Sequence, residues 1–365
     1  MHTARACAVA TLAAALALTI AAFAPQSVQG QAAEAKTAAQ EFKNITQLKD
    51  IPADQLMPAM QFMSVSLGVQ CDFCHVEGKP EADDKGPKKT ARSMIAMQMA
   101  INKDSFRGRT QVTCYSCHRG AATPVAVPPV LESDAAPAPR TPAAAGAPAT
   151  VTPDQIVDKY ISALGGADAM HKVSSRILKG SILAMGSDTS TEILTKAPNK
   201  RVSISHSARG DSFTAFDGTT GWMGSATGAR DMSAADSAAY GLDAEFYLPI
   251  RMKELFPQLR RGRPEQVDGV DCETLTGATA SRMQVRMYFA KDSGLLVRLI
   301  RYTENPLGRM PVQIDYSDYR DDGAGVKIPY RWTLARPNGR FTTQLKEVQP
   351  NASIDDAKFA KPAAK

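Results

Sequence analysis

The chain has 365 residues, which is more than one ordinary domain and suggests two domains. Hydrophobic residues make up 44% of the chain and aromatic residues 6%, values that are compatible with globular cores. The formal net charge of +6 is spread along the chain and is not gathered into basic blocks, which argues against a nucleic-acid partner.

The N-terminus has the pattern of a secretory signal peptide, which we assign to residues 1–30. Arg5 supplies a positive charge, residues 8–23 form an apolar run rich in alanine and leucine, and small residues follow. The run falls short of the roughly 18 residues expected of a helix that spans a membrane. We therefore expect export to the periplasm. An uncleaved membrane anchor is the alternative, which leaves membrane association open.

Residues 41–130 are expected to form a small, mostly α-helical domain that is rich in methionine. A helix is expected over residues 54–67, where Gly68 would end it, and a second over residues 90–102. Each helix precedes a copy of the sequence Cys-x-x-Cys-His.

The pattern Cys-x-x-Cys-His is the attachment motif for c-type haem. In such a site both cysteines form thioethers with the porphyrin, and the histidine is an axial ligand of the iron. The residues concerned are Cys71, Cys74 and His75 in the first motif and Cys114, Cys117 and His118 in the second. Two structural disulfides are the alternative in an exported chain, but a disulfide has no use for an adjacent histidine. We therefore expect two covalently bound c-type haems.

The ligand on the other side of each iron decides the chemistry, because an open site suits peroxide or oxygen chemistry and a second strong ligand suits electron transfer. After export only His171 and His206 remain outside the motifs, and we interpret both as ordinary surface or strand residues. Methionine is the other candidate, and methionines precede both motifs. Their alternative role is packing in the core. We expect that role for Met57, Met63, Met97 and Met99.

The segments SLGVQCDFCH and ARSMIAMQMAIN…VTCYSCHRG lie within residues 50–129. They resemble the third-haem and second-haem segments of the cytochrome c subunit of photosynthetic reaction centres, the tetrahaem subunit of purple bacteria. In the third-haem segment a methionine lies eleven residues before the first cysteine, which implies Met60 as the ligand opposite His75. In the second-haem segment the ligand directly follows Ala-Arg-x, which implies Met94 opposite His118.

The resemblance implies a dihaem electron carrier whose partners are redox proteins, either periplasmic or in a membrane electron-transfer complex. The chain has two haem motifs instead of four and no lipid-anchor cysteine, which favours a free-standing carrier over one docked to a reaction centre. Two alternatives stay open. One is a dihaem peroxidase-like enzyme with an open iron site, and the other is a binding protein whose haem domain reports redox state.

Residues 131–150 are dense in proline and alanine and are expected to form a linker. Residues 151–350 are expected to form a mostly antiparallel β domain with helices on one side, an α+β arrangement. Thr152 and Pro153 would begin a helix, and residues 232–255 would be helical as well. Alternating polar and apolar residues predict strands within 176–186, 191–197, 201–208, 211–218, 283–290, 295–304, 312–320 and 330–337.

The segments APNKRVSIS, FDGTTGWMGS and YFAKDSGLLVRLIRY resemble the bacterial lipoprotein-sorting carriers of the LolA type. That fold is an incomplete β-barrel that wraps a helix and can hold acyl chains. The resemblance implies a fold and leaves a hydrophobic ligand for this domain as an open alternative. We expect Trp222, Gly218 and Gly221 to be turn and core residues, and Cys272 to be a buried strand thiol. No nucleophile–base pair is recognisable here.

Overall fold

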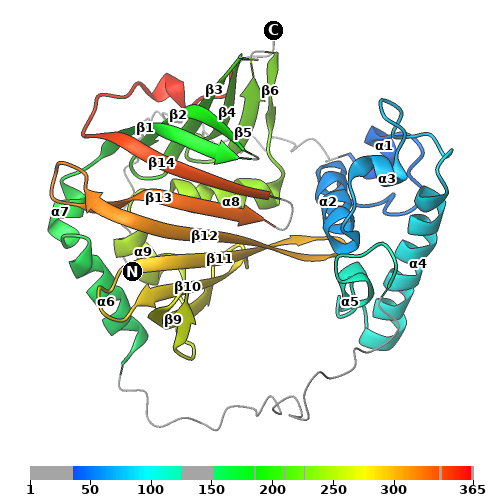
Figure 1. The fold of residues 1–365 in the computed structure, drawn as a ribbon, viewed down its shortest axis with the longest axis horizontal. Helices are drawn as coiled ribbons and strands as arrows, with labels where there is room; N and C mark the ends of the chain where they lie inside the picture. The colour runs from blue at the N-terminus through cyan, green and yellow to red at the C-terminus, as the bar shows by residue number, and fades with distance from the viewer. Residues whose placement is uncertain are drawn as a thin grey trace, which may run out of the picture. The chain divides into compact units, whose positions relative to one another are not determined.

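The computed structural model describes residues 36–124 and 151–362, apart from 185, 209, 226, 337 and 338. The predicted signal peptide (1–30) and linker (131–150) lie outside these residues. The first stretch is helical and the second is built mainly of strands, as Figure 1 shows. No helix in the described ranges is both long enough and apolar enough to cross a membrane.

The helical stretch contains both expected helices. Its elements are α1 (Ala38–Glu41), the 3-10 helix η1 (Ala53–Gln55), α2 (Leu56–Leu67), α3 (Cys71–Cys74), α4 (Gly86–Phe106) and α5 (Cys114–His118). The helix α4 is longer at both ends than the predicted 90–102. The added turns contain Lys88, Lys89 and Lys103, and lysine has good helix propensity but adds nothing to an apolar pattern.

The remaining elements form a large antiparallel sheet with helices. The helices are α6 (Pro153–Ala163), α7 (Ala167–His171), α8 (Ala234–Ala244), α9 (Leu248–Leu255) and the 3-10 helix η2 (Asp356–Lys358). The strands are β1 (Ser175–Ala184), β2 (Ser187–Lys196), β3 (Lys200–Ser207), β4 (Gly210–Phe216), β5 (Gly221–Ser225), β6 (Gly228–Asp231), β7 (Arg260–Arg261), β8 (Glu265–Val267), β9 (Val270–Ala278), β10 (Gln284–Ala290), β11 (Leu296–Asn305), β12 (Gly308–Asp321), β13 (Lys327–Arg336) and β14 (Gly339–Pro350).

The sheet is open. Within the described residues its order is β6-β5-β4-β3-β2-β1-β14-β13-β12-β11-β10-β9-β7, with β8 paired to β9. The two ends of this order do not pair with each other, so the sheet curls without closing, and the expected incomplete barrel is confirmed. All eight predicted strand runs fall on strands, and 232–255 holds α8 and α9.

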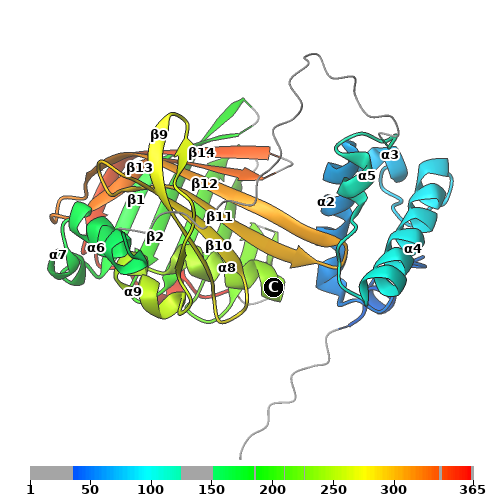
Figure 2. The ribbon, with the colours of Figure 1, turned by 90° about the horizontal axis from the view of Figure 1, so that it is seen from below.

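Helices cover one face of the sheet, as Figure 2 shows for α6, α8 and α9. Strand β10 explains why, because its alternate residues face two different clusters. Val285, Met287 and Phe289 join the main core with residues of the three helices, whereas Tyr288 packs on the other side with Cys272. Side chains of a strand alternate between faces, so only one set of them needs the helices as cover.

Helix α6 begins as the sequence predicts. The Thr152 side chain accepts a hydrogen bond from Gln155 N at 3.2 Å, and the Gln155 side chain accepts one from Thr152 N at 2.9 Å. This reciprocal cap satisfies two donors at the start of the helix. Trp222 is also a core residue as expected, with 3% of its surface exposed, and its ring N–H donates to the carbonyl oxygen of Phe359 at 2.8 Å.

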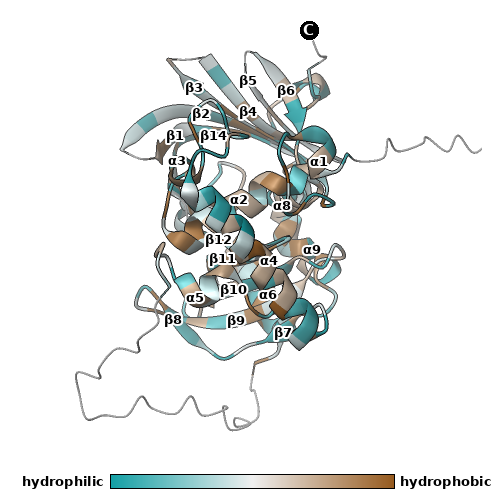
Figure 3. Ribbon diagram, turned by 90° about the vertical axis from the view of Figure 1, so that its right-hand side faces the viewer, coloured by the Kyte–Doolittle hydropathy of each residue, from teal (hydrophilic) through white to brown (hydrophobic). Residues whose placement is uncertain are grey.

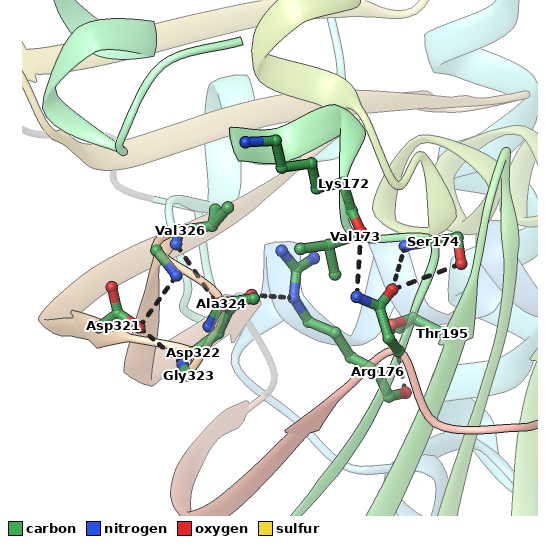
Figure 4. Close-up of polar contacts among 12 residues, drawn as sticks. Lys172, Val173, Ser174, Arg176, Thr195, Asp321, Asp322, Gly323, Ala324 and Val326 are labelled. Atoms are coloured by element: carbon green, nitrogen blue, oxygen red, sulfur yellow. Dashed lines mark hydrogen bonds and ion pairs between the residues drawn. The ribbon is translucent and has the colours of Figure 1, made fainter. Parts of the chain in front are cut away.

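A buried ion pair joins the start of β1 to the loop between β12 and β13 (Figure 4). Arg176 Nε donates to Asp322 Oδ2 at 2.8 Å, and the Asp322 side chain is fully buried. The other carboxylate oxygen accepts the backbone N–H groups of Ala324 and Val326. One carboxylate therefore shapes the loop and neutralises the arginine.

We predict that Asp322→Ala lowers the free energy of unfolding of this domain by about 3–5 kcal/mol, because it leaves a buried arginine without its partner. Both tryptophans of the chain, Trp222 and Trp332, lie in this domain, so their fluorescence during urea unfolding would follow it. The control is Glu347→Ala, which removes the exposed pair with Lys179 and should cost less than about 1 kcal/mol. Equal losses in both variants would contradict the prediction.

Candidate functional site

The first Cys-x-x-Cys-His motif lies on α3, a single helical turn. Cys71 and Cys74 are three residues apart, so both thiols are on one side of the turn. His75 follows as the C-cap with φ −112° and ψ 146°, where the chain leaves the helix and becomes extended. The motif therefore presents two thiols and an imidazole from five consecutive residues.

A backbone carbonyl group holds the ring of His75. Its Nδ1 lies 2.8 Å from the carbonyl oxygen of Pro80. A carbonyl oxygen carries no hydrogen, so Nδ1–H is the donor and the lone pair of Nε2 is free. This is the tautomer that a metal-ligating histidine adopts, because its second nitrogen is fixed by an outer partner.

The second motif repeats this arrangement on α5. Its N-cap, Thr113, donates its backbone N–H to Ser116 Oγ at 3.0 Å. Nδ1 of His118 lies 3.0 Å from the carbonyl oxygen of Ala121, so Nε2 of this histidine is free as well. Cys114 is partly buried and Cys117 is exposed. The two sites thus offer the same set of donor atoms.

The cysteines of both motifs are free thiols. All five cysteines in the described ranges are unpaired, so the alternative of two disulfides receives no support. Burial raises the pKa of the Cys74 thiol and of the Cys114 thiol. Neither is therefore set up as a reactive thiolate, which requires a lowered pKa.

The end of α2 and the end of α5 meet at two glycines. Gly68 caps α2 with φ +66°, a left-handed conformation that favours glycine. Gly120, just after α5, donates its N–H to Ser66 O at 2.9 Å. A Cβ atom on Gly68 would lie 2.1 Å from the carbonyl oxygen of Gly120. Backbone contact without a side chain therefore ties the helix of Met60 to the second motif.

The segment before the second motif is bound to α4 by side-chain amides. Asn102 Oδ1 accepts the N–H groups of Gln111 and Val112, both at 2.9 Å, and its amide donates to Val112 O at 2.7 Å. Gln98 donates to the same oxygen at 2.9 Å. These buried amides fix the segment that leads to Cys114. They could not be predicted from the sequence, because a lone amide in a helix has no recognisable motif.

The methionines of α2 divide into packed and exposed residues. Ala59 and Phe62 are buried with Ile95, and Met63 packs against them as expected. Met60 is half-buried. Met57 is 55% exposed, so the expectation that it packs in the core is wrong.

The methionines of α4 lie away from its buried face. That face carries Lys88, Ile95, Gln98 and Asn102. The exposed fractions of Met94, Met97 and Met99 are 37%, 48% and 45%, so the core role expected for the last two is wrong. Polar residues occupy three of the four buried positions of this helix, so the methionines contribute little to what it buries. Figure 3 shows both hydrophilic (teal) and hydrophobic (brown) residues along α4.

The carboxylate of Asp83, close to the first motif in the chain, has three side-chain partners. Asp83 is bound by Arg92 at 2.9 Å, Asn44 at 3.0 Å and Lys88 at 3.1 Å. The hydrogen bond from Arg92, followed by those from Asn44 and Lys88, lowers the pKa of Asp83 well below its usual range. Asp83 thereby joins the N-terminal end of α4 to the loop that follows His75.

The residues around the motifs fit covalently attached haem. Each motif supplies two thiols for thioethers and one imidazole with a free Nε2, the donor set of a c-type site. The residues between the cysteines include Phe73 and Tyr115, which are 41% and 54% exposed and lie next to the thiols in the chain. Such apolar surface suits contact with a porphyrin.

Other candidate residues behave as ordinary structural groups. The exposed side chains of His206 and Asp211 pair at 2.9 Å, and the ring centroids of His171 and Tyr247 are 5.6 Å apart. Cys272 is fully buried in β9, as expected. Within the described part of the chain, no group of three or more His, Cys, Asp and Glu side chains could hold a metal ion.

Comparison with known proteins finds relatives of the part of the chain that contains the helical segment. Residues 6–161 match the family described as Photosynthetic reaction centre cytochrome C subunit. The chain is 34% identical over 91 residues to the photosynthetic reaction center cytochrome c subunit of Thermochromatium tepidum. That match covers 24% of this chain and 22% of the relative, so the chain spans about a fifth of the relative's length. The resemblance inferred from residues 50–129 is confirmed.

Solved structures similar to the β domain include two of low identity. A LolA superfamily protein from Nitrosomonas europaea is 13% identical with a TM-score of 0.42, over 58% of this chain and 98% of that one. A DUF1329 family protein from Desulfovibrio piger is 12% identical with a TM-score of 0.37, over 57% of this chain and 96% of that one. The inferred likeness to lipoprotein-sorting proteins is thus found again, and it does not bear on what this domain binds.

We predict that Gly68→Ala lowers the thermal stability of the haem-loaded helical segment by more than about 2 kcal/mol. The left-handed backbone costs about 1–2 kcal/mol with a side chain, and the added Cβ meets the Gly120 carbonyl group. Gly78→Ala is the matched control, because Gly78 has φ +71° and nothing within 4 Å of the added Cβ. Thermal melts followed by haem absorbance would compare them. Equal losses would show that the contact with Gly120 does not matter.

We predict that the helical segment loses stability as the pH falls below about 4, the usual carboxyl pKa. The pKa of Asp83 is lowered, so the folded state binds fewer protons than the unfolded state in this window, and stability rises with pH there. Asp83→Asn should be less stable at neutral pH and should lose this part of the acid dependence. Melting temperatures measured from pH 2 to pH 7 would test it, and an unchanged acid profile in the variant would contradict it.

Proposed function

We propose that this protein is an exported dihaem c-type cytochrome that transfers single electrons between redox proteins. The observation that carries the proposal is that His75 and His118 have the same tautomer. Both donate Nδ1–H to a backbone carbonyl group and keep Nε2 free for iron. The same tautomer next to both Cys-x-x-Cys pairs supports two equivalent ligand sites.

Each motif would hold one haem through its own residues. The thiols of Cys71 and Cys74 would form the thioethers of the first haem, and those of Cys114 and Cys117 the thioethers of the second. Nε2 of His75 and Nε2 of His118 would each take one axial position. Bound haem supplies a one-electron iron couple.

Met60 and Met94 are the proposed ligands on the opposite side of the two irons, Met60 with His75 and Met94 with His118. Met60 is half-buried on α2, and Met94 is 37% exposed on α4. Both thioethers are therefore available to a group outside the protein core. Two strong axial ligands suit electron transfer, since nothing has to bind or leave.

The surrounding residues would keep each site rigid. The carbonyl groups of Pro80 and Ala121 fix the imidazole rings, and the Asn102 amide fixes the approach to the second motif. A rigid site suits an electron carrier because ligands that move little between redox states add little to the barrier. The periplasm is the proposed location, on the basis of the signal-peptide pattern of residues 1–30.

The β domain has no assigned chemistry in this proposal. A hydrophobic ligand or a protein partner is the open alternative, and it rests on the lipoprotein-sorting resemblance alone. Mass spectrometry of lipids that copurify with the full chain would detect such a ligand.

We predict that the purified protein contains two haems and that neither binds carbon monoxide when reduced, because both irons have two strong ligands. Met60→Ala should remove the methionine–iron charge-transfer band of one haem, lower its reduction potential and open it to carbon monoxide. Met94→Ala should do the same to the other haem. Absorption spectra with and without carbon monoxide would measure this.

Met57→Ala and Met97→Ala are the matched controls, since both side chains are exposed on the same two helices. They should leave the spectra unchanged. Survival of both methionine bands in Met60→Ala would show that Met60 is not a ligand. Binding of carbon monoxide to one haem of the unmodified protein would favour the peroxidase-like enzyme instead.

A further inference from the structure

The carbonyl oxygen that holds His75 has a second donor. Pro80 O accepts Nδ1–H of His75 at 2.8 Å and a hydrogen bond from Lys88 Nζ at 2.9 Å. The lysine comes from α4, and the histidine and proline belong to the first motif and its loop. A cationic group and the candidate haem ligand therefore share one acceptor.

Lys88 is fixed in this position. Only 8% of its surface is exposed, which is unusual for a lysine. Its ammonium group also donates to Ala82 O at 2.8 Å and pairs with Asp83 at 3.1 Å, so all three N–H donors have partners. Asn44 donates to the same oxygen of Asp83, Oδ1, and Arg92 binds the other oxygen, Oδ2. The charge cannot swing away into solvent without breaking this set of contacts.

We propose that Lys88 is a positioning residue that raises the reduction potential of the haem held by His75. This inference rests on the proposed function, because it requires iron on Nε2 of His75. A carbonyl group that accepts a strong hydrogen bond from Nδ1–H makes the imidazole a better electron donor, which favours oxidised iron. Lys88 draws electron density from that oxygen, weakens the effect and so favours reduced iron.

The charge of Lys88 acts in the same direction. Oxidised iron carries one more positive charge than reduced iron, and a nearby ammonium group repels it more strongly. Burial limits the screening of this repulsion by water and salt. Asp83 offsets part of the charge, but Arg92 neutralises Asp83 in turn. Both effects therefore raise the potential.

The second motif provides an internal comparison. The carbonyl oxygen of Ala121 accepts Nδ1–H of His118 at 3.0 Å, and among the hydrogen bonds of the described residues no lysine shares it. A change at Lys88 should therefore move one of the two midpoint potentials and leave the other in place.

The experiment is a redox titration of the full-length protein carrying both haems, with Lys88→Met beside the unmodified chain. The variant should keep two haems and a low-spin spectrum while one midpoint falls. The expected change in that haem's reduction equilibrium is about three- to tenfold, where tenfold corresponds to about 59 mV for one electron. Lys89→Met is the matched control, because it removes the same charge from an exposed neighbour on α4. It should shift neither midpoint to this extent.

Conservative variants of Lys88 distinguish an effect on the reduction potential from an effect on folding. Lys88→Arg keeps a cationic donor, so its midpoint potential should stay close to that of the unmodified protein. If Lys88→Met loses a haem, Lys88→Gln carries the same expectation, because it keeps an N–H donor without the charge. Loss of a haem in both variants would make the role of Lys88 structural and overturn the inference.

The remaining outcomes are equally decisive. Two unchanged midpoints, an equal shift of both, or a similar shift in Lys89→Met would overturn the role of Lys88 and leave the proposed function intact. The proposed function itself would fail separately, if the unmodified chain held fewer than two haems or if His75→Ala left both haem spectra unaltered.

Discussion

Two hydrogen bonds from histidine to backbone carbonyl groups underlie the proposed chemistry. They give His75 and His118 one tautomer and one ring orientation, and they leave Nε2 as the free nitrogen in both. The acceptors, Pro80 and Ala121, follow their histidines by five and three residues, so each site is largely local in the chain. Among the described residues, Lys88 donates a second hydrogen bond to the carbonyl oxygen of Pro80 but not to that of Ala121. This difference can give the two haems different reduction potentials.

Polar side chains organise the helical segment to an unusual degree. Lys88, Gln98 and Asn102 take buried positions of α4 that an amphipathic helix normally gives to apolar residues. Each is hydrogen-bonded to backbone carbonyl groups of loops next to a motif. Buried polar groups with partners specify one arrangement, whereas apolar contacts tolerate several. The loops around both motifs are thereby fixed with little hydrophobic core.

The β domain follows a different principle. Its main core forms where α6, α8 and α9 cover one face of the open sheet. A buried pair between Arg301 of β11 and Asp243 of α8, with Nη2 and Oδ2 2.8 Å apart, adds a directional contact to that apolar layer. A second buried pair, between Arg176 and Asp322, joins the start of β1 to the loop between β12 and β13. The apolar core and the two ion pairs stabilise the β domain, and none of them forms a catalytic site.

The sequence by itself determined whatever depends on near neighbours in the chain. Both Cys-x-x-Cys-His motifs, the cap of α6 at Thr152, the stop of α2 at Gly68 and the alternating strands are local patterns with local causes. Tertiary structure decided which residues meet across the chain: Lys88 with Pro80, Asn102 with Val112, and Gly68 with Gly120. It also decided that Met57, Met97 and Met99 are exposed, because a helix's buried face is set by what packs against it and not by which residues are apolar.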